Sequence, residues 1–118
     1  MIKGIGTDII EISRIAQAIE RSPCFLEKAF TQQELIQNPK VQSLSGNFAT
    51  KEAVSKAFGT GFREFNLQDI EVLRDRLGKP YINLYGNAKL LAQKQNITNI
   101  SVSISHCKEY AVSFVVAE

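Results

Sequence analysis

The sequence predicts the α+β class, with a mostly antiparallel sheet packed against one long and several short helices. Three patterns carry this prediction. Apolar residues alternate along residues 2–12, recur at helical spacing along residues 41–58, and alternate with serine along residues 100–106. The predicted order is one strand, three helices, two strands, one helix and two strands. This grouping favours helices that cover one side of an antiparallel sheet.

The first strand is predicted over residues 2–12, where isoleucine recurs. Because successive side chains of a strand point to opposite faces, alternation puts Asp8 on the same face as Ile2, Ile10 and Ile12. A lone carboxylate on an apolar face is costly unless it has a partner. Asp8 is therefore the first candidate for a functional residue.

Three helical segments follow the first strand. The first ends near Ser22-Pro23, because proline disfavours helical geometry in the residue before it. Residues 25–38 contain one or two short helical turns, in which Thr31 and Glu34 have the spacing of a capping box. The long helix is predicted over residues 41–58 and ends at a pair of glycines.

The second half of the chain has the shorter period of strands. Its strands are flanked by turns rich in glycine and charged residues, and one further helix separates the two strand pairs. The predicted elements are strands over 68–74 and 80–85 around a turn at 75–79, a helix over 86–95 with Ala88, Leu91 and Ala92 inward, and strands over 100–106 and 110–116.

A second carboxylate lies on an apolar face of the long helix. At helical spacing Glu52 continues the stripe that runs through Leu44 and Phe48. Two such carboxylates, Asp8 and Glu52, suggest a shared cation. With Lys56 and a glycine-rich segment nearby, they suit Mg²⁺ that holds a phosphorylated substrate.

Each of these residues also has an ordinary structural interpretation. Asp8 could cap the next helix or pair with a lysine, and Glu52 could form a surface pair with Lys56 at i, i+4. The segment made of Gly59, Thr60 and Gly61 could be a plain helix C-cap, or its backbone N–H groups could face a diphosphate. It is not a P-loop, because the lysine precedes the glycines.

Small residues form a stripe beside Glu52 on the long helix, and two glycines precede Asp8 on the first strand. Small side chains let another element approach closely, but the same space could admit a ligand. The sequence leaves both interpretations open. The residues are Gly46, Ala49, Ala53 and Ala57 on the helix, and Gly4 and Gly6 on the strand.

Composition excludes several classes of function. The chain has 118 residues, which predicts a single domain over residues 1–118, and its net charge of +2 is too small to indicate nucleic acid. No apolar run is long enough to span a membrane, and the N-terminus lacks a signal-peptide pattern. Cys24 and Cys107 are expected to be free thiols in a reducing cytoplasm.

Three further residues are weaker candidates when taken alone. His106 is the only histidine and ends an alternating strand, where histidine is more often structural or exposed than catalytic. Arg14 and Arg21 fall on the helix face opposite the isoleucine stripe. They form a solvated face or a docking surface for an acidic partner.

Five motifs in this order resemble those of a known family, the holo-acyl-carrier-protein synthases, which are the small type of 4′-phosphopantetheinyl transferase. The resemblance runs essentially from end to end, and five motifs in register over so short a chain are highly specific. The motifs are Gly6-Thr7-Asp8-Ile9-Ile10-Glu11-Ile12, Phe48-Ala49-Thr50-Lys51-Glu52-Ala53, Lys56-Ala57-Phe58-Gly59-Thr60-Gly61, Gly78-Lys79-Pro80 and Ser103-Ile104-Ser105-His106.

The resemblance implies the 4′-phosphopantetheinyl transferase fold and an activity. Such enzymes move 4′-phosphopantetheine from coenzyme A to a serine of apo acyl carrier protein, in fatty-acid biosynthesis, and release adenosine 3′,5′-bisphosphate. Asp8 and Glu52 would then be the Mg²⁺ ligands, and Lys56 would stabilise charge on the diphosphate. Glu52 would also help to deprotonate the serine.

The resemblance also implies contacts and an assembly. His106 would contact coenzyme A near its adenosine and 3′-phosphate, and residues 59–61 would approach the diphosphate through their backbone. Family members are homotrimers with active sites between subunits. Acyl carrier proteins are acidic, which gives Arg14, Arg21 and Lys28 a partner.

One residue departs from the family pattern. Many relatives have arginine before the aromatic residue of the second motif, where this chain has Asn47. A contact to a phosphate of coenzyme A would then be missing, or supplied by Lys51, Arg63 or another subunit.

Two other classes of protein compete with the transferase. One is a non-catalytic module that binds coenzyme A or a nucleotide, which has less need of Asp8, Glu52 and Lys56 together. The other is a structural trimeric protein that binds acidic partners through its basic helix. Binding of an acidic partner by such a structural protein would survive removal of metal.

Overall fold

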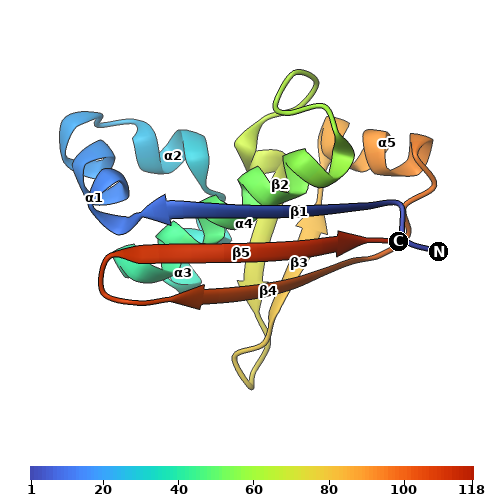
Figure 1. Cartoon of the computed structure of the whole chain (residues 1–118). Helices are drawn as coiled ribbons and strands as arrows, with labels where there is room; N and C mark the ends of the chain where they lie inside the picture. The colour runs from blue at the N-terminus through green and yellow to red at the C-terminus, as the bar shows by residue number, and fades with distance from the viewer.

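The computed structural model describes all residues, 1–118, and confirms the predicted α+β class (Figure 1). Most elements begin and end within two residues of the predicted bounds. The elements are β1 (Gly4–Glu11), α1 (Ile12–Arg21), α2 (Phe25–Ala29), α3 (Gln32–Gln37), α4 (Val41–Phe58), the 3₁₀ turn η1 (Leu67–Asp69), β2 (Ile70–Arg74), β3 (Pro80–Leu84), α5 (Gly86–Lys94), β4 (Ile100–His106) and β5 (Tyr110–Ala117).

The strands form two sheets rather than one. A three-stranded sheet has the order β1-β5-β4, and a two-stranded sheet consists of β2 and β3. Every pairing is antiparallel, and the register places Asp8 opposite Ser113. The β2 strand begins later than predicted, because Asn66 and Asp69 form a capping box that starts the η1 turn.

The long helix α4 lies across one face of the three-stranded sheet, behind β1 and β5 in Figure 1. The main core forms where this helix meets both sheets and α5. Its fully buried side chains include Ala53, Val54, Ile70, Val72 and Val115. The three predicted inward residues of α5 are all buried: Ala88, Leu91 and Ala92.

Close approach explains the small residues of β1 and α4. A Cβ atom on Gly4 would collide with the carbonyl oxygen of Ala57, and one on Gly6 would collide with that of Ala53. The strand backbone therefore packs directly against the helix backbone. Of the two interpretations left open by the sequence, the structure supports packing at these positions.

The other face of the three-stranded sheet carries exposed apolar side chains. Ile5 and Ile9 of β1 are 60% and 64% exposed, and Phe114 of β5 is 46% exposed. Ile2 precedes β1 and is also exposed, so its predicted place on the inner face was wrong. No helix of the protein combines the length and the apolar character needed to cross a bilayer.

Candidate active site

The packing of β1 on α4 brings Asp8, Glu52 and Lys56 together. Lys56 Nζ lies 3.2 Å from Asp8 Oδ1 and 2.9 Å from the carbonyl oxygen of Thr7. Asp8 therefore forms an ion pair with a lysine, which is one of the structural interpretations considered for it. The surface pair considered for Glu52 is not present, because Lys56 turns to the strand instead of to its own helix.

The two carboxylates interact unfavourably. Burial raises the pKa of Glu52, the negative charge of Asp8 raises it further, and Lys56 lowers it only in part. Glu52 forms no ion pair, and no third histidine, cysteine or carboxylate completes a metal cluster. Two carboxylate donors with room for substrate oxygens and water are nevertheless the set that Mg²⁺ commonly uses. The residues present therefore fit this ion.

Glu52 lines a cavity of about 560 Å³ between α4, α2 and the segment that leads to β2. Phe62, Phe65 and Leu67 make part of its lining apolar, and Lys28 adds a positive charge beside the negative charge of Glu27. The lining residues are Glu27, Lys28, Glu52, Phe62, Phe65, Asn66, Leu67 and Gln68. Lys56 lines a separate hollow of about 240 Å³, which Ile5 and Phe114 of the exposed sheet face also border. The charged cluster is thus accessible from two sides of α4.

The glycine segment after α4 serves as a helix cap. Gly59 is in the left-handed conformation with φ of 80°, and its N–H donates to the carbonyl oxygens of Ser55 and Lys56. Thr60 donates its hydroxyl to the carbonyl oxygen of Gly61. A role of these residues toward the diphosphate stays a prediction.

The remaining predicted residues lie farther from the carboxylates. His106 is exposed at the end of β4, and strand β5 separates it from β1 and Asp8. On α1, Arg14 pairs with Glu11 at 3.4 Å and Arg21 is exposed in the last turn. Of the three proposed partner-binding residues, only Lys28 borders the Glu52 cavity.

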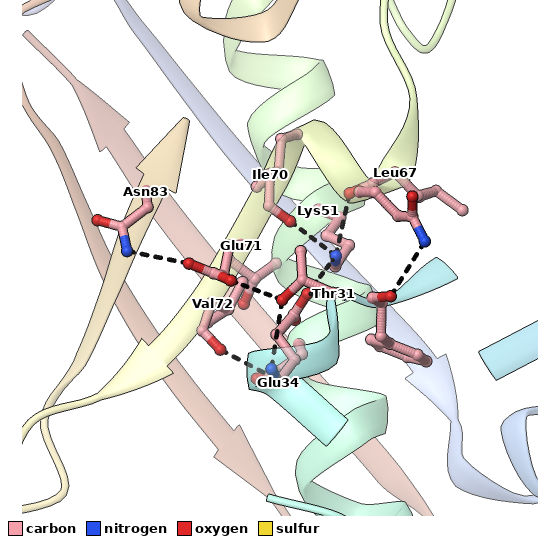
Figure 2. Close-up of polar contacts among 12 residues, drawn as sticks. Thr31, Glu34, Lys51, Leu67, Ile70, Glu71, Val72 and Asn83 are labelled. Carbon is pink, nitrogen blue, oxygen red and sulfur yellow. Dashed lines mark hydrogen bonds and ion pairs between the residues drawn. The ribbon is translucent and has the colours of Figure 1, made fainter. Parts of the chain in front are cut away.

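Sequence reasoning missed a buried ion pair behind the site (Figure 2). Lys51 and Glu34 are both fully buried, and Lys51 Nζ lies 2.7 Å from Glu34 Oε1. Lys51 also donates to the carbonyl oxygens of Leu67 at 3.0 Å and Ile70 at 2.7 Å. A signal was available, because Lys51 follows Leu44 by seven residues and therefore shares its buried face.

The buried pair corrects one expectation. Lys51 cannot replace an arginine toward coenzyme A, because its side chain is inaccessible and its ammonium has three acceptors. Asn47 is fully buried too, and donates from Nδ2 to the carbonyl oxygen of Val72 at 3.2 Å. Of the substitutes considered within the chain, Arg63 remains exposed.

Comparison with known proteins defines the class. A model of the 4′-phosphopantetheinyl transferase superfamily matches residues 4–115. The chain therefore belongs to this superfamily.

Relatives within the superfamily match over their whole length. The holo-[acyl-carrier-protein] synthase of Lachnoclostridium phytofermentans is 52% identical, over 100% of this chain and 97% of that protein. The crystal structure of the corresponding synthase from Neisseria meningitidis has a TM-score of 0.91 and 36% identity, and covers 100% of this chain and 99% of that one. The synthase from Helicobacter pylori, solved in complex with coenzyme A, has a TM-score of 0.87 and 35% identity, with 97% and 99% covered.

Proposed function

We propose that this protein transfers 4′-phosphopantetheine from coenzyme A to a serine of apo acyl carrier protein. The serine oxygen forms a bond to the phosphorus that carries pantetheine, and the bond to the bridging oxygen of the diphosphate breaks. Adenosine 3′,5′-bisphosphate leaves, and the serine proton passes to a base. The observation that carries the proposal is the cluster of Asp8, Glu52 and Lys56 in a chain similar from end to end to holo-[acyl-carrier-protein] synthases.

Asp8 and Glu52 would hold Mg²⁺ in this reaction. When bound, the ion neutralises charge on the diphosphate and orients it. Lys56 stabilises the same charge. Its ammonium has three N–H donors, and the protein uses two of them, on Thr7 and Asp8. The third is available for a phosphate oxygen.

Glu52 is also the proposed base for the serine hydroxyl. It is partly buried and lines the larger of the two cavities, from which a serine hydroxyl can approach it. It accepts the proton directly or through a water molecule.

The proposal includes a homotrimer with sites between subunits. The exposed apolar face of β1 and β5 supports assembly, since water-exposed apolar patches commonly mark interfaces. A second subunit packed against this face would bring His106 of one subunit toward Asp8 and Glu52 of the other. Ile9→Asp combined with Phe114→Asp should yield monomers in sedimentation velocity. Leu77→Asp, which changes an apolar side chain that is 87% exposed on a different element, should leave the assembly intact.

Arg14, Arg21 and Lys28 are proposed to dock the acidic carrier protein. The two arginines project from an exposed helix, and Lys28 lies beside the cavity that contains Glu52. Reversing the charge of Arg14 and Arg21 should raise the KM for carrier protein about tenfold, with little effect on coenzyme A binding. Equal loss of both would contradict this role. Reversing Lys89 on α5 is the matched control.

The location follows from the same proposal. We place the protein in the cytoplasm, where the free and exposed thiols of Cys24 and Cys107 would stay reduced. Fractionation of cells tests this.

Intact-mass spectrometry tests the reaction directly. Apo acyl carrier protein, coenzyme A, Mg²⁺ and this protein should yield carrier protein heavier by one phosphopantetheine, and EDTA should prevent the gain. Coenzyme A binding without any gain in mass would instead support the non-catalytic module. A gain that persists in EDTA would remove the metal from the proposal.

A further inference from the structure

The ammonium of Lys51 joins three segments that are separate in the sequence. It donates to Glu34 on α3, to the carbonyl oxygen of Leu67 in η1 and to that of Ile70 at the start of β2. Figure 2 shows the ammonium between these acceptors, at the end of a side chain that rises from α4. All three of its N–H donors are used inside the protein.

One of these acceptors, Leu67, lines the Glu52 cavity, and another, Ile70, lies two residues after the last lining residue, Gln68. We call residues 62–70 the cavity wall, because Phe62, Phe65, Asn66, Leu67 and Gln68 line the cavity that Glu52 also lines. Lys51 precedes Glu52 on the same helix. Lys51, which holds the wall, and Glu52, which lines the same cavity as the wall, therefore lie on one turn of α4.

The wall also packs against α4 through apolar side chains, because Phe65 and Ile70 belong to the main core together with Val54. Phe65 packs edge-on against Phe58 of α4 with ring centroids 5.6 Å apart. Within the wall, Phe62 and Phe65 are tilted against each other at 5.2 Å. On the other side Gln68 Nε2 donates to the carbonyl oxygens of Glu27 and Phe30, which ties the wall to α2. Lys51 supplies the only side-chain hydrogen bonds from α4 to the wall.

Stability alone does not account for this charge. Burial lowers the pKa of Lys51 and raises that of Glu34, and their mutual attraction opposes both changes. Replacing a buried ion pair with apolar side chains of similar volume is often neutral or stabilising. An apolar pair would nevertheless leave the carbonyl groups of Leu67 and Ile70 without this donor.

We propose that Lys51 is a positioning residue, which fixes the cavity wall opposite Glu52 by holding two of its carbonyl groups to α4. The inference rests on the proposed function, because it assigns the wall a part in placing the reacting groups beside Glu52. Displacement by about 1 Å of groups that orient a substrate can cost a hundredfold in rate.

The test compares two variants that both remove the ion pair. Lys51→Met/Glu34→Leu also removes the donor to the carbonyl groups of Leu67 and Ile70, whereas Glu34→Gln keeps a side-chain oxygen and leaves Lys51 on both carbonyl groups, with its ammonium then buried without an anion. The double variant should melt below the wild type, because two carbonyl groups lose their donor. At a temperature where it is folded it should lose ten- to a hundredfold in kcat, with the KM for coenzyme A within about twofold. Glu34→Gln should also melt below the wild type, but at a temperature where it is folded it should keep most of the wild-type kcat.

Hydrogen exchange provides a measurement that does not depend on activity. Amides of residues 62–70 should exchange faster in the double variant than in Glu34→Gln, while those of β1 and β5 stay unchanged. Wild-type exchange and kcat in the double variant would overturn the proposal, as would an equal loss in Glu34→Gln.

A failure of the variants to fold can be distinguished from a failure of the proposed function. If Lys51→Met/Glu34→Leu does not fold, Lys51→Leu/Glu34→Met offers a second packing of the same volume. Failure of both would overturn the proposal, since the pair would then be needed for the fold itself. If the wild type transfers no phosphopantetheine, the proposed function fails, and the exchange comparison still decides whether Lys51 holds the wall.

Discussion

Lys51 and Lys56 lie five residues apart on one helix, yet their surroundings differ completely. Lys51 is fully buried and has an acceptor for every donor, whereas the side chain of Lys56 is 56% exposed and has one donor free. A second carboxylate, Glu71, also lies near Lys51, but it accepts hydrogen bonds from Thr31, Asn83 and Tyr85. Next to Lys56, two carboxylates oppose each other. The ammonium of Lys51 needs no further partner, although Glu34 Oε2 is buried without one, and the cluster around Lys56 gains from a ligand.

The largest expected effect is on the buried pair. Lys51→Met should lower the free energy of unfolding by about 3–5 kcal/mol, because it leaves the Glu34 carboxylate buried without its cation. Urea unfolding followed by circular dichroism measures this. A loss below about 1 kcal/mol would mean that the Glu34 carboxylate is not held in a buried site once Lys51 is replaced.

Removal of a carboxylate at the open cluster should affect transfer and spare the fold. Asp8→Asn and Glu52→Ala should each lower the transfer rate about a thousandfold, because each removes a proposed Mg²⁺ ligand. Initial rates of holo-carrier formation measure this. Glu118→Gln is the matched control, and full activity in either site variant would remove the metal-site argument.

Lys56→Met should separate the two lysines most clearly. An exposed ion pair contributes about 0–1 kcal/mol, so stability should change little, whereas transfer should fall about a hundredfold. Chemical unfolding and initial rates on the same preparation provide both values. Instability comparable to that of Lys51→Met would show that the two lysines have the same role.

The smallest effect concerns the pH dependence of stability. The pKa of Glu52 in the folded protein is raised above 4.5, so its contribution to stability is greatest below that pH and is lost as the pH rises through the raised value. Glu52→Gln cannot ionise, and in EDTA it should melt slightly above the wild type at pH 7 but not at pH 4. Solvent screening keeps the difference small.

Added Mg²⁺ should make the wild type melt above Glu52→Gln at pH 7. The ion should raise the melting temperature of the wild type and leave that of Glu52→Gln nearly unchanged. Parallel melting curves at pH 7 in both variants, with and without Mg²⁺, would contradict the proposed metal site.

Local signals made much of the fold predictable. Gly59 marked the end of α4, and Thr31 with Glu34 marked the start of α3, where the structure has the full capping box. Asp8 and Glu52 were found because each is a carboxylate on an apolar face. These signals operate between residues close in the sequence.

Contacts between distant segments were not predictable in the same way. The division into two sheets depends on which strands pair across the molecule. The pair of Lys51 and Glu34 depends on α3 lying against α4 and β2, and the acceptors in Leu67 and Ile70 are backbone groups that no side-chain pattern reveals.

The glycines of β1 have a consequence for how this protein can change over generations. Gly4 and Gly6 press the strand backbone against the α4 backbone, so the spacing between Asp8 and Glu52 is set by main chains in contact. Every replacement of a glycine by another amino acid introduces a side chain, and at these two positions it would collide with the carbonyl oxygens of α4. At Gly59 and Gly61 the space around a new Cβ is open, although φ is positive. Natural variation should therefore be restricted at Gly4 and Gly6 by the contact between main chains.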